Sequence, residues 1–271
     1  MARPADLTVA TWNINSVRLR EDLVMRFLVE QNPDVLCLQE IKSPAENVNT
    51  ARYDELGWPH HAISGQKGYN GVMILSRLPL KVIANRQIHG KNEARHIACR
   101  LANGITIENF YVPAGGYVAD AAANEKFAEK LAYLDGMVRW TSAEPPRKTI
   151  LVGDLNVAPL PDDVWSHKQL LTVVSHTPRE TETLEAIMAA GRWTDITRKH
   201  IPDGKLYSWW SYRAQDWSKS DRGRRLDHIW ASRDLAEFSS GSTILRDARG
   251  WPRPSDHVPV MASFEITALS Q

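Results

Sequence analysis

The stretch Thr149-Ile150-Leu151-Val152-Gly153-Asp154-Leu155-Asn156 joins a short apolar run to an abrupt change to polar residues. Residues 149–152 are predicted to form a buried β-strand, because short β-branched runs of this kind pack well inside a sheet. Asp154 and Asn156 follow directly. A carboxylate and an amide are therefore expected in a loop that the strand anchors, a common place for functional side chains.

Similar apolar runs recur along the chain and alternate with helical patterns. Further strands are predicted at residues 7–12, 35–39, 72–75, 105–111, 226–231 and 258–264. Helices are predicted after Ser16, within 121–139 and over 182–190. The first helix would carry its apolar residues on one side, namely Leu19, Leu23, Val24, Phe27 and Leu28. One α/β domain over residues 1–271 is the simplest account of this order.

Polar side chains gather at the ends of these predicted strands. The set comprises Asn13, Glu40, Tyr111, Asp154, Asn156, Asp227, Asp256 and His257. Strand ends can hold residues from distant parts of a sequence around one point, so we expect a cation-binding site that handles phosphate. Hydrolysis of an anionic phosphodiester needs this chemistry: Mg²⁺ bound by one or two carboxylates, and a water placed in line with the leaving group.

Composition and charge exclude several classes of protein. The formal net charge is +1, so a nucleic-acid enzyme would need one basic face rather than a basic surface overall. The N-terminal residues lack a signal-peptide pattern, and no stretch approaches the roughly 20 apolar residues of a membrane span. Cys37 and Cys99 are expected to be reduced thiols, with Cys37 buried. A cytoplasmic protein that does not bind membranes is the expectation.

Six short segments in a fixed order resemble the exonuclease III family of abasic-site endonucleases, within the endonuclease/exonuclease/phosphatase superfamily. They are TWNIN (11–15), LQEIK (38–42), NFYVP (109–113), GDLN (153–156), RLDH (225–228) and SDHVP (255–259). The resemblance covers roughly residues 7–265. It implies a four-layered α/β sandwich of two packed, mixed β-sheets flanked by helices. It also implies a monomeric hydrolase that acts on double-stranded DNA with an abasic site or a 3′ end.

The resemblance also implies roles for the strand-end residues. Glu40 would be the main Mg²⁺ ligand with help from Asn13, and Mn²⁺ could substitute. Asp154 would activate the attacking water and Asn156 would orient it. Asp227 would hold His257 toward the scissile phosphate, which Tyr111 would contact. The wider metal environment would include Asp154, Asn156, Asp256 and His257.

Two further segments would contact the substrate. Residues 207–213, YSWWSYR, interleave aromatic and cationic side chains, a pattern typical of nucleic-acid surfaces. By resemblance Trp209 borders a pocket for a flipped-out abasic sugar, with Arg213 nearby, whereas Trp210 is expected to be buried. Tyr69 and Asn70 are candidate contacts to a DNA strand.

The sequence departs from the family in two places. Ala114 stands where many members have Asn or Gln that reaches the phosphate, and Asn15 stands where the animal branch has a carboxylate. Ala114 cannot donate that hydrogen bond, which affects the expected affinity for phosphate. Asn15 weakens the case for a second tightly bound metal.

Simpler explanations exist for each motif alone. Asp154 and Asn156 could form an ordinary turn, Asp227 could pair with Arg224 or Arg225, and Asn13 could cap a helix. The lone histidines His167, His176 and His200 are interpreted as surface residues. At the level of function, the alternatives are a nonspecific DNase or phosphatase of the same superfamily, and a non-catalytic nucleic-acid-binding relative. The six segments in family order favour the repair enzyme.

Overall fold

A computed structural model describes residues 6–214 and 216–266 of the chain. Within these residues, two six-stranded sheets pack face to face. The first sheet has the order β13 (Ser239–Ile244), β14 (Val260–Glu265), β1 (Asp6–Asn13), β2 (Val35–Gln39), β4 (Val72–Ser76) and β3 (His60–Ser64). The second has the order β5 (Leu80–Ala84), β6 (His96–Leu101), β7 (Thr106–Tyr111), β8 (Thr149–Asp154), β12 (Asp227–Ser232) and β9 (Trp193–Asp195).

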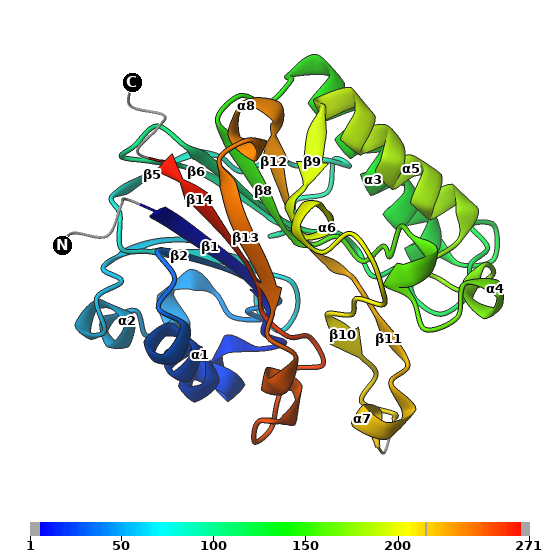
Figure 1. The fold of residues 1–271 in the computed structure, drawn as a ribbon, viewed down its shortest axis with the longest axis horizontal. Helices are drawn as coiled ribbons and strands as arrows, with labels where there is room; N and C mark the ends of the chain where they lie inside the picture. Colours follow the sequence, from blue (N-terminus) through cyan, green and yellow to red (C-terminus); the bar gives the residue numbers. More distant parts are fainter. Residues whose placement is uncertain (1–5, 215, 267–271) are drawn as a thin grey trace.

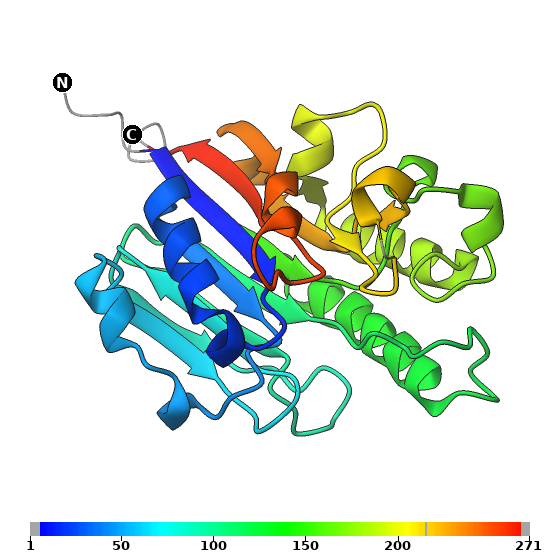
Figure 2. The same cartoon turned by 90° about the horizontal axis from the view of Figure 1, so that it is seen from below.

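Helices cover the outer face of each sheet (Figures 1 and 2). α1 (Val17–Gln31) packs on the first sheet through a cluster that includes Val24 and Phe27. α3 (Glu125–Ala143) and α5 (Pro178–Gly191) cover the second sheet. The largest apolar cluster lies between the two sheets and contains Cys37 and Cys99. The four-layered sandwich of mixed sheets is thus confirmed.

Shorter elements complete the chain. They are η1 (Ala45–Asn47), α2 (Ala51–Glu55), η2 (Pro161–Asp163), α4 (His167–Leu170), α6 (Ile196–His200), α7 (Trp217–Ser220), α8 (Arg233–Ala236), η3 (Arg246–Gly250) and a ribbon of β10 (Trp209–Trp210) with β11 (Gly223–Arg224). Figure 1 shows this ribbon and α7 projecting from one end of the sandwich. No helix of residues 6–214 and 216–266 has the length and apolarity to cross a membrane.

The direction of the strands explains why the polar residues meet. β1 and β2 are parallel neighbours in one sheet, and β7 and β8 are parallel neighbours in the other. Because β12 runs antiparallel to β8, its first residue, Asp227, lies opposite Asp154, the last residue of β8. β14 is likewise antiparallel to β1. The carboxyl ends of β1, β2, β7 and β8 and the amino ends of β12 and β14 therefore lie at one edge of the sandwich.

The start of α1 differs from its prediction. Ser16 does occupy the N-cap position, but its φ is 86° and its side chain makes no capping hydrogen bond. Instead its backbone N–H donates to the carbonyl of Glu40 at 2.7 Å. Leu19 is 76% exposed and so does not belong to the buried face of the helix. The helix start is thus tied to the loop that carries Glu40, since the N–H of Val17, one of the first-turn donors without a partner inside the helix, also donates to this loop, at the Ile41 carbonyl (3.2 Å).

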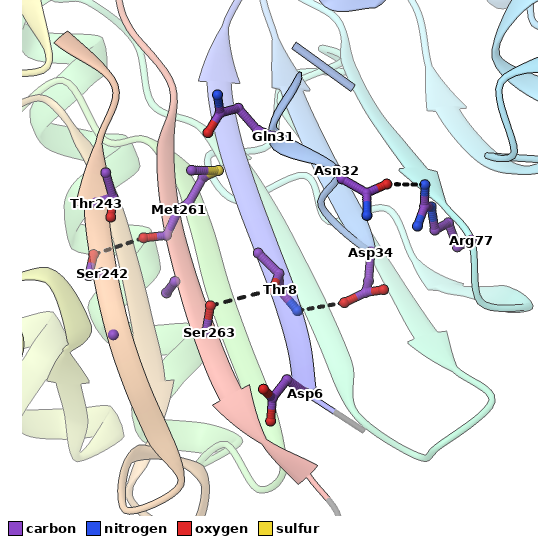
Figure 3. Close-up of a pocket in the computed structure, with 12 residues that line it drawn as sticks. Asp6, Thr8, Gln31, Asn32, Asp34, Arg77, Ser242, Thr243, Met261 and Ser263 are labelled. Carbon is purple, nitrogen blue, oxygen red and sulfur yellow. Dashed lines mark hydrogen bonds between the residues drawn. The ribbon is translucent and has the colours of Figure 1, made fainter. Parts of the chain in front are cut away.

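A polar hollow of about 750 Å³ lies on the outer face of the first sheet, away from this edge (Figure 3). It is lined by residues of β1, β13 and β14 together with the segment after α1. Within it, the backbone N–H of Thr8 donates to Asp34 Oδ2 at 2.8 Å, and Arg77 contacts Asn32. None of the polar strand-end residues lines this hollow.

Candidate active site

Asp154, Asp227 and His257 form a buried group that we call the acid–histidine cluster. Nδ1 of His257 lies 2.7 Å from Asp227 Oδ2, and its Nε2 lies 3.7 Å from Asp154 Oδ2. The exposed fraction is 1% for Asp154, 0% for Asp227 and 4% for His257. The backbone around His257 is fixed as well, because its carbonyl accepts from Trp12 Nε1 at 3.0 Å. Two carboxylates therefore flank one imidazole away from solvent.

The burial and charges of this cluster shift the pKa values of its members. Burial alone would lower the pKa of His257, but the negative charges of Asp227 and Asp154 outweigh it and raise that pKa to about 10. Burial raises the pKa of Asp154 to about 7; the His257 cation opposes this shift and the Asp227 charge adds to it. The two aspartates therefore favour the cationic form of His257, and burial favours the protonated form of Asp154 more than in an ordinary aspartate.

Glu40 lies beside the cluster and is more open to solvent, with 19% of its side chain exposed. Its Oε1 accepts from Tyr111 Oη at 2.7 Å and from Asn13 Nδ2 at 2.9 Å, and its Oε2 pairs with Lys42 Nζ at 2.8 Å. Burial would raise the pKa of Glu40, yet the Lys42 cation and these hydrogen bonds lower it overall. Burial and the nearby carboxylates hold the pKa of Tyr111 well above its usual range, so its hydroxyl stays a donor.

Two asparagine side chains connect Glu40 to the cluster. Besides its bond to Glu40, Asn13 Nδ2 donates to Asp154 Oδ2 at 2.8 Å. Asn156 Nδ2 donates to the same Asp154 oxygen at 3.1 Å, and its backbone N–H donates to Oδ1 at 3.0 Å. Asn13 also closes a short turn, since its Oδ1 accepts from the Asn15 N–H at 3.1 Å. The structure thus brings seven of the predicted strand-end residues into one group, in which hydrogen bonds join Asn13, Glu40, Tyr111, Asp154 and Asn156, and the 3.7 Å contact from His257 to Asp154 adds the pair His257 and Asp227.

The eighth strand-end residue, Asp256, has different partners. Its Oδ2 accepts from Trp209 Nε1 at 3.0 Å and its Oδ1 from Asn15 Nδ2 at 3.2 Å. Within the described part of the chain, its carboxylate makes no hydrogen bond to Glu40 or the acid–histidine cluster. Asp256 therefore joins the loop after β1 to the ribbon that carries Trp209.

The donor atoms at this edge fit a hard divalent cation. Asp154, Asp227 and His257 each offer a ligand atom within 4.8 Å of the others, and Asp227 Oδ1 is buried without a hydrogen-bond partner among the described residues. Carboxylate and amide oxygens are suitable ligands for Mg²⁺. A cationic imidazole cannot coordinate a metal, so Glu40 and Asp154 fit the ion better than His257 does. The predicted ligand Asn13 presents its amide N–H groups to these two carboxylates, and its Oδ1 accepts from Asn15.

A second group with ligand-like spacing, His89, Glu93 and Glu129, lies elsewhere. Its carboxylates are already paired, Glu93 with Arg95 at 2.5 Å and Glu129 with Lys91 at 3.2 Å. Each of these carboxylates has a cation of its own, whereas Asp154 and Asp227 share only His257. The edge with Glu40 is the better cation site.

The predicted substrate-contacting residues surround this edge in different ways. Trp209 is half-buried, and the guanidinium of Arg224 lies 5.2 Å from the centroid of its ring. Trp210 is buried, as expected. Arg213 is exposed and lies 5.2 Å from the ring centroid of Tyr117. Tyr69 is 54% exposed. Asn70 is buried and its amide donates to Gln66 Oε1 at 3.1 Å, so it holds its own loop together.

Some residues around the site correct or extend the sequence interpretation. His176 was expected at the surface but is 1% exposed, and its Nδ1 donates to the Ala158 carbonyl at 2.6 Å. Arg225, offered as a partner for Asp227, pairs instead with Asp163 and Asp195. Lys130 was not predicted to matter, yet it is buried beside Asn156. Its position three residues after Phe127 on the apolar side of α3 was the available signal.

Comparisons with known proteins agree with this geometry. Residues 10–257 match the profile of the Endonuclease/Exonuclease/phosphatase family. The chain is 29% identical to an exodeoxyribonuclease III of Haemophilus influenzae, over 94% of this chain and 98% of that protein. An AP endonuclease structure from Archaeoglobus fulgidus is 32% identical with a TM-score of 0.88, and it covers 95% of this chain and 99% of its own.

A third similar structure contains DNA. It is the 3′ phosphatase NExo from Neisseria bound to a product DNA hairpin, 30% identical, with a TM-score of 0.88 over 95% of this chain and 99% of that chain. The match to the family profile spans the strand-end residues from Glu40 to His257. On these grounds the chain belongs to the Endonuclease/Exonuclease/phosphatase family.

Proposed function

We propose that this protein is a Mg²⁺-dependent DNA-repair phosphodiesterase that hydrolyses the DNA backbone 5′ to abasic sites and trims 3′ ends of duplex DNA. The observation that carries the proposal is the buried acid–histidine cluster hydrogen-bonded through Asn13 to the more open carboxylate of Glu40. An exodeoxyribonuclease III, an AP endonuclease and a 3′ phosphatase among the similar proteins support the substrate class. We infer that the protein works as a monomer on cytoplasmic DNA.

Glu40 would hold the cation, with Asp154 completing the protein's share of the ligands, and Asn13 would hold the two carboxylates in place through its amide N–H groups. When bound, Mg²⁺ or a substituting Mn²⁺ would neutralise charge on the phosphate oxygens and on the leaving oxygen. Lys42 keeps Glu40 ionised and ready for a cation, since its charge is what chiefly lowers the pKa of Glu40 against the effect of burial. Asp256 is the weaker candidate ligand, because its carboxylate is bonded to Asn15 and Trp209 and not to Glu40 or Asp154.

Asp154 would take the proton of the attacking water. A general base works best when its pKa lies near the working pH, and burial raises the pKa of Asp154 to about 7. Asn156 is held 3.1 Å from the same carboxylate, so its amide can fix the direction of that water. A positioned base typically contributes about 10²–10⁴-fold to a rate.

His257 would face the phosphate as a cation. Asp227 accepts a hydrogen bond from Nδ1, which leaves the Nε2 side of the ring directed toward Asp154 and the reaction centre. An N–H donor on a cation stabilises the extra negative charge of the pentacovalent transition state. Tyr111, held protonated, would donate to a phosphate oxygen once that oxygen competes with Glu40 for its hydroxyl.

Trp209 and Arg213 would set the preference for damaged DNA. A missing base lowers the cost of turning a nucleotide out of the helix, and a half-buried indole can border the space that receives the sugar. The bond from Trp209 Nε1 to Asp256 fixes that ring relative to the catalytic edge. Tyr69, exposed on another loop, would contact the DNA strand, while Asn70 would shape that loop from inside.

The proposal is tested with 5′-labelled duplexes containing an internal abasic site, a recessed 3′ end or a 3′ phosphate, alongside an undamaged duplex and an inositol phosphate. With Mg²⁺ we expect hydrolysis of the damaged or 3′-terminated duplexes, and excess chelator should abolish it. Hydrolysis of inositol phosphate in preference to DNA would favour another branch of the family. DNA binding without hydrolysis in either Mg²⁺ or Mn²⁺ would contradict the enzymatic proposal.

A further inference from the structure

Beneath the catalytic edge lies an ion pair that the proposed chemistry does not use. Lys130 of α3 and Glu180 of α5 are each 0% exposed, and Lys130 Nζ lies 2.5 Å from Glu180 Oε1. Figure 1 shows these two helices side by side against the second sheet. Burying two opposite charges is seldom a net gain in stability over apolar side chains of similar size. The pair therefore calls for a reason beyond holding the helices together.

Lys130 reaches past Glu180 to the catalytic loop. Its Nζ donates a 2.6 Å hydrogen bond to the backbone carbonyl of Asn156. Asn156 has a backbone φ of 53°, which lies in the left-handed region that residues other than glycine seldom adopt. A buried cation on its carbonyl fixes the direction of that peptide, because turning the peptide would leave the carbonyl without a partner and the ammonium with Glu180 alone.

The orientation of this peptide matters for the carboxylate of Asp154. The N–H and the side-chain amide of Asn156 both donate to Asp154, and the amide also donates to the Val112 carbonyl at 2.9 Å. The carbonyl held by Lys130 belongs to the peptide that follows the same Cα, so a shift of that peptide would displace the Cα from which these three bonds are directed. Lys130 thus fixes the residue that, in the proposed reaction, directs the attacking water.

The carboxylate of Glu180 is in turn held by several hydrogen bonds. Its two oxygens accept from the backbone N–H groups of Ser175 and Thr177 at 2.9–3.1 Å and from the Thr177 hydroxyl at 2.7 Å. The chain also packs closely on the lysine stem, since a Cβ on Gly115 would lie 2.8 Å from Lys130 Cδ. The ammonium is therefore held by the start of α5 and enclosed by the loop after β7.

We propose that Lys130, oriented by Glu180, is a positioning residue that holds Asn156 in its catalytic conformation. This inference rests on the proposed phosphodiesterase activity. Lys130 contacts neither substrate nor attacking water in this account; it acts through Asn156. Its removal should therefore lower kcat and leave KM nearly unchanged.

The main test replaces both charges together, as Lys130→Met/Glu180→Gln, so that neither partner is left buried and uncompensated. We expect kcat on the abasic duplex to fall by about 10–100-fold with KM within about threefold, because a displacement of about 1 Å at a catalytic group can cost that much. The matched control is Asp135→Asn/Arg179→Gln. It removes an exposed 2.8 Å pair between the same two helices, and its kcat should stay at the wild-type value.

A double-mutant cycle separates positioning from general destabilisation. If Lys130 acts through the Asn156 side chain, replacing the pair in an Asn156→Ala background should change kcat by less than about threefold, since the two effects share one route. An undiminished loss in that background would overturn the proposal. So would wild-type kcat in the neutral-pair variant, or loss of its folded state, which would assign the pair to stability alone.

The result also distinguishes this inference from the function on which it rests. A wild-type chain that cuts none of the duplexes overturns the proposed activity and the role of Lys130 with it. Activity in the wild type together with equal kcat in the neutral-pair variant overturns only the role of Lys130.

Discussion

Two buried charged groups lie around strand β12, and they differ in how completely their charges are paired. The first is the acid–histidine cluster. The second, which we call the arginine cluster, consists of Asp163, Asp195, Arg198, Arg225 and His228. Arg225 and Asp227 are two residues apart, yet they serve different groups. Both clusters contain buried aspartates and one histidine.

In the arginine cluster the carboxylates are well matched by cations. Asp163 accepts from Arg225 through both oxygens at 2.8 Å and from Arg198 at 2.6 Å. Burial would raise the pKa of Asp163, but the two guanidinium groups lower it overall. Burial, aided by the Arg225 charge, lowers the pKa of His228 to about 4. These groups keep fixed charges across the physiological range.

In the acid–histidine cluster two carboxylates share a single imidazole. Asp227 Oδ1 has no hydrogen-bond partner among the described residues, and the pKa of Asp154 rises to about 7. The same residue types thus have opposite consequences. Complete pairing gives a rigid support with fixed charge, and incomplete pairing gives a site able to accept a proton and a cation.

The largest expected effect is on the stability of the arginine cluster. Arg225→Met leaves Asp163 and Asp195 without their shared cation, and breaking a buried pair in this way typically costs about 3–5 kcal/mol. Urea unfolding should show that loss, while the kcat of the folded fraction stays near the wild-type value. An unaltered free energy of unfolding would mean that the cluster does not support the fold.

Substitution of His257 should mainly lower kcat, whereas substitution of His228 should mainly lower the melting temperature. His257→Gln removes the proposed cationic donor and should lower kcat by about 10²–10³-fold, the usual cost of a lost transition-state donor. His228→Gln should leave kcat nearly unchanged and lower the melting temperature, because His228 bonds the Val157 carbonyl inside the core. Steady-state kinetics and thermal melts of both variants provide the measurement. A larger kinetic effect at His228 would reverse the assignment of the two clusters.

The pH dependence of the rate follows from the same difference. Activity should rise as Asp154 loses its proton near pH 7 and fall as His257 loses its proton near pH 10. Asp227→Asn removes the negative charge that raises the pKa of His257, so the alkaline limb should move to lower pH by about 1–3 units. The acid limb should also move down, since Asp227 raises the pKa of Asp154. A pH–rate profile with an unmoved alkaline limb would show that His257 does not act as a cation.

The smallest expected effect is the stabilisation by a divalent cation. Mg²⁺ at about 100 times its Kd should add about 2.7 kcal/mol to the free energy of unfolding. For a chain of this size that corresponds to a rise in melting temperature of several degrees. Glu40→Gln should remove the rise, whereas Asp163→Asn should retain it on a lower baseline. A rise that survives in Glu40→Gln would place the cation elsewhere.

Much of the fold could be predicted from short apolar runs. The strands that became β1, β2, β4, β7, β8, β12 and β14 were predicted to within about two residues, because each contains buried apolar or β-branched residues that stand out from the polar residues around them. β3, β5, β6, β9 and β13 were not predicted. β5 is largely exposed, and β13 reads SSGSTI, so neither presents a clear apolar pattern. Such strands depend on neighbours in the sheet rather than on their own sequence.

The members of the candidate site could be predicted, but their partners could not. Asn13, Glu40, Asp154, Asp227 and His257 were all placed at strand ends. Which cation serves which carboxylate depends on distant chain segments: Asp163 takes Arg225, 62 residues away in sequence. His176 was wrongly predicted to be a surface residue, because its polar neighbours in sequence do not reveal that it is hydrogen-bonded to the Ala158 carbonyl. The tertiary structure thus determines which cation pairs with which carboxylate.

The central claim is that Asp154, left incompletely paired in the interior, is the base of a hydrolytic centre. It is tested most directly by comparing wild type with Asp154→Asn on the abasic duplex, with saturating Mg²⁺ and equal melting temperatures verified beforehand. We expect kcat to fall by about 10²–10⁴-fold in the variant, the contribution of a positioned base. A variant that keeps its activity within about tenfold of wild type would contradict it.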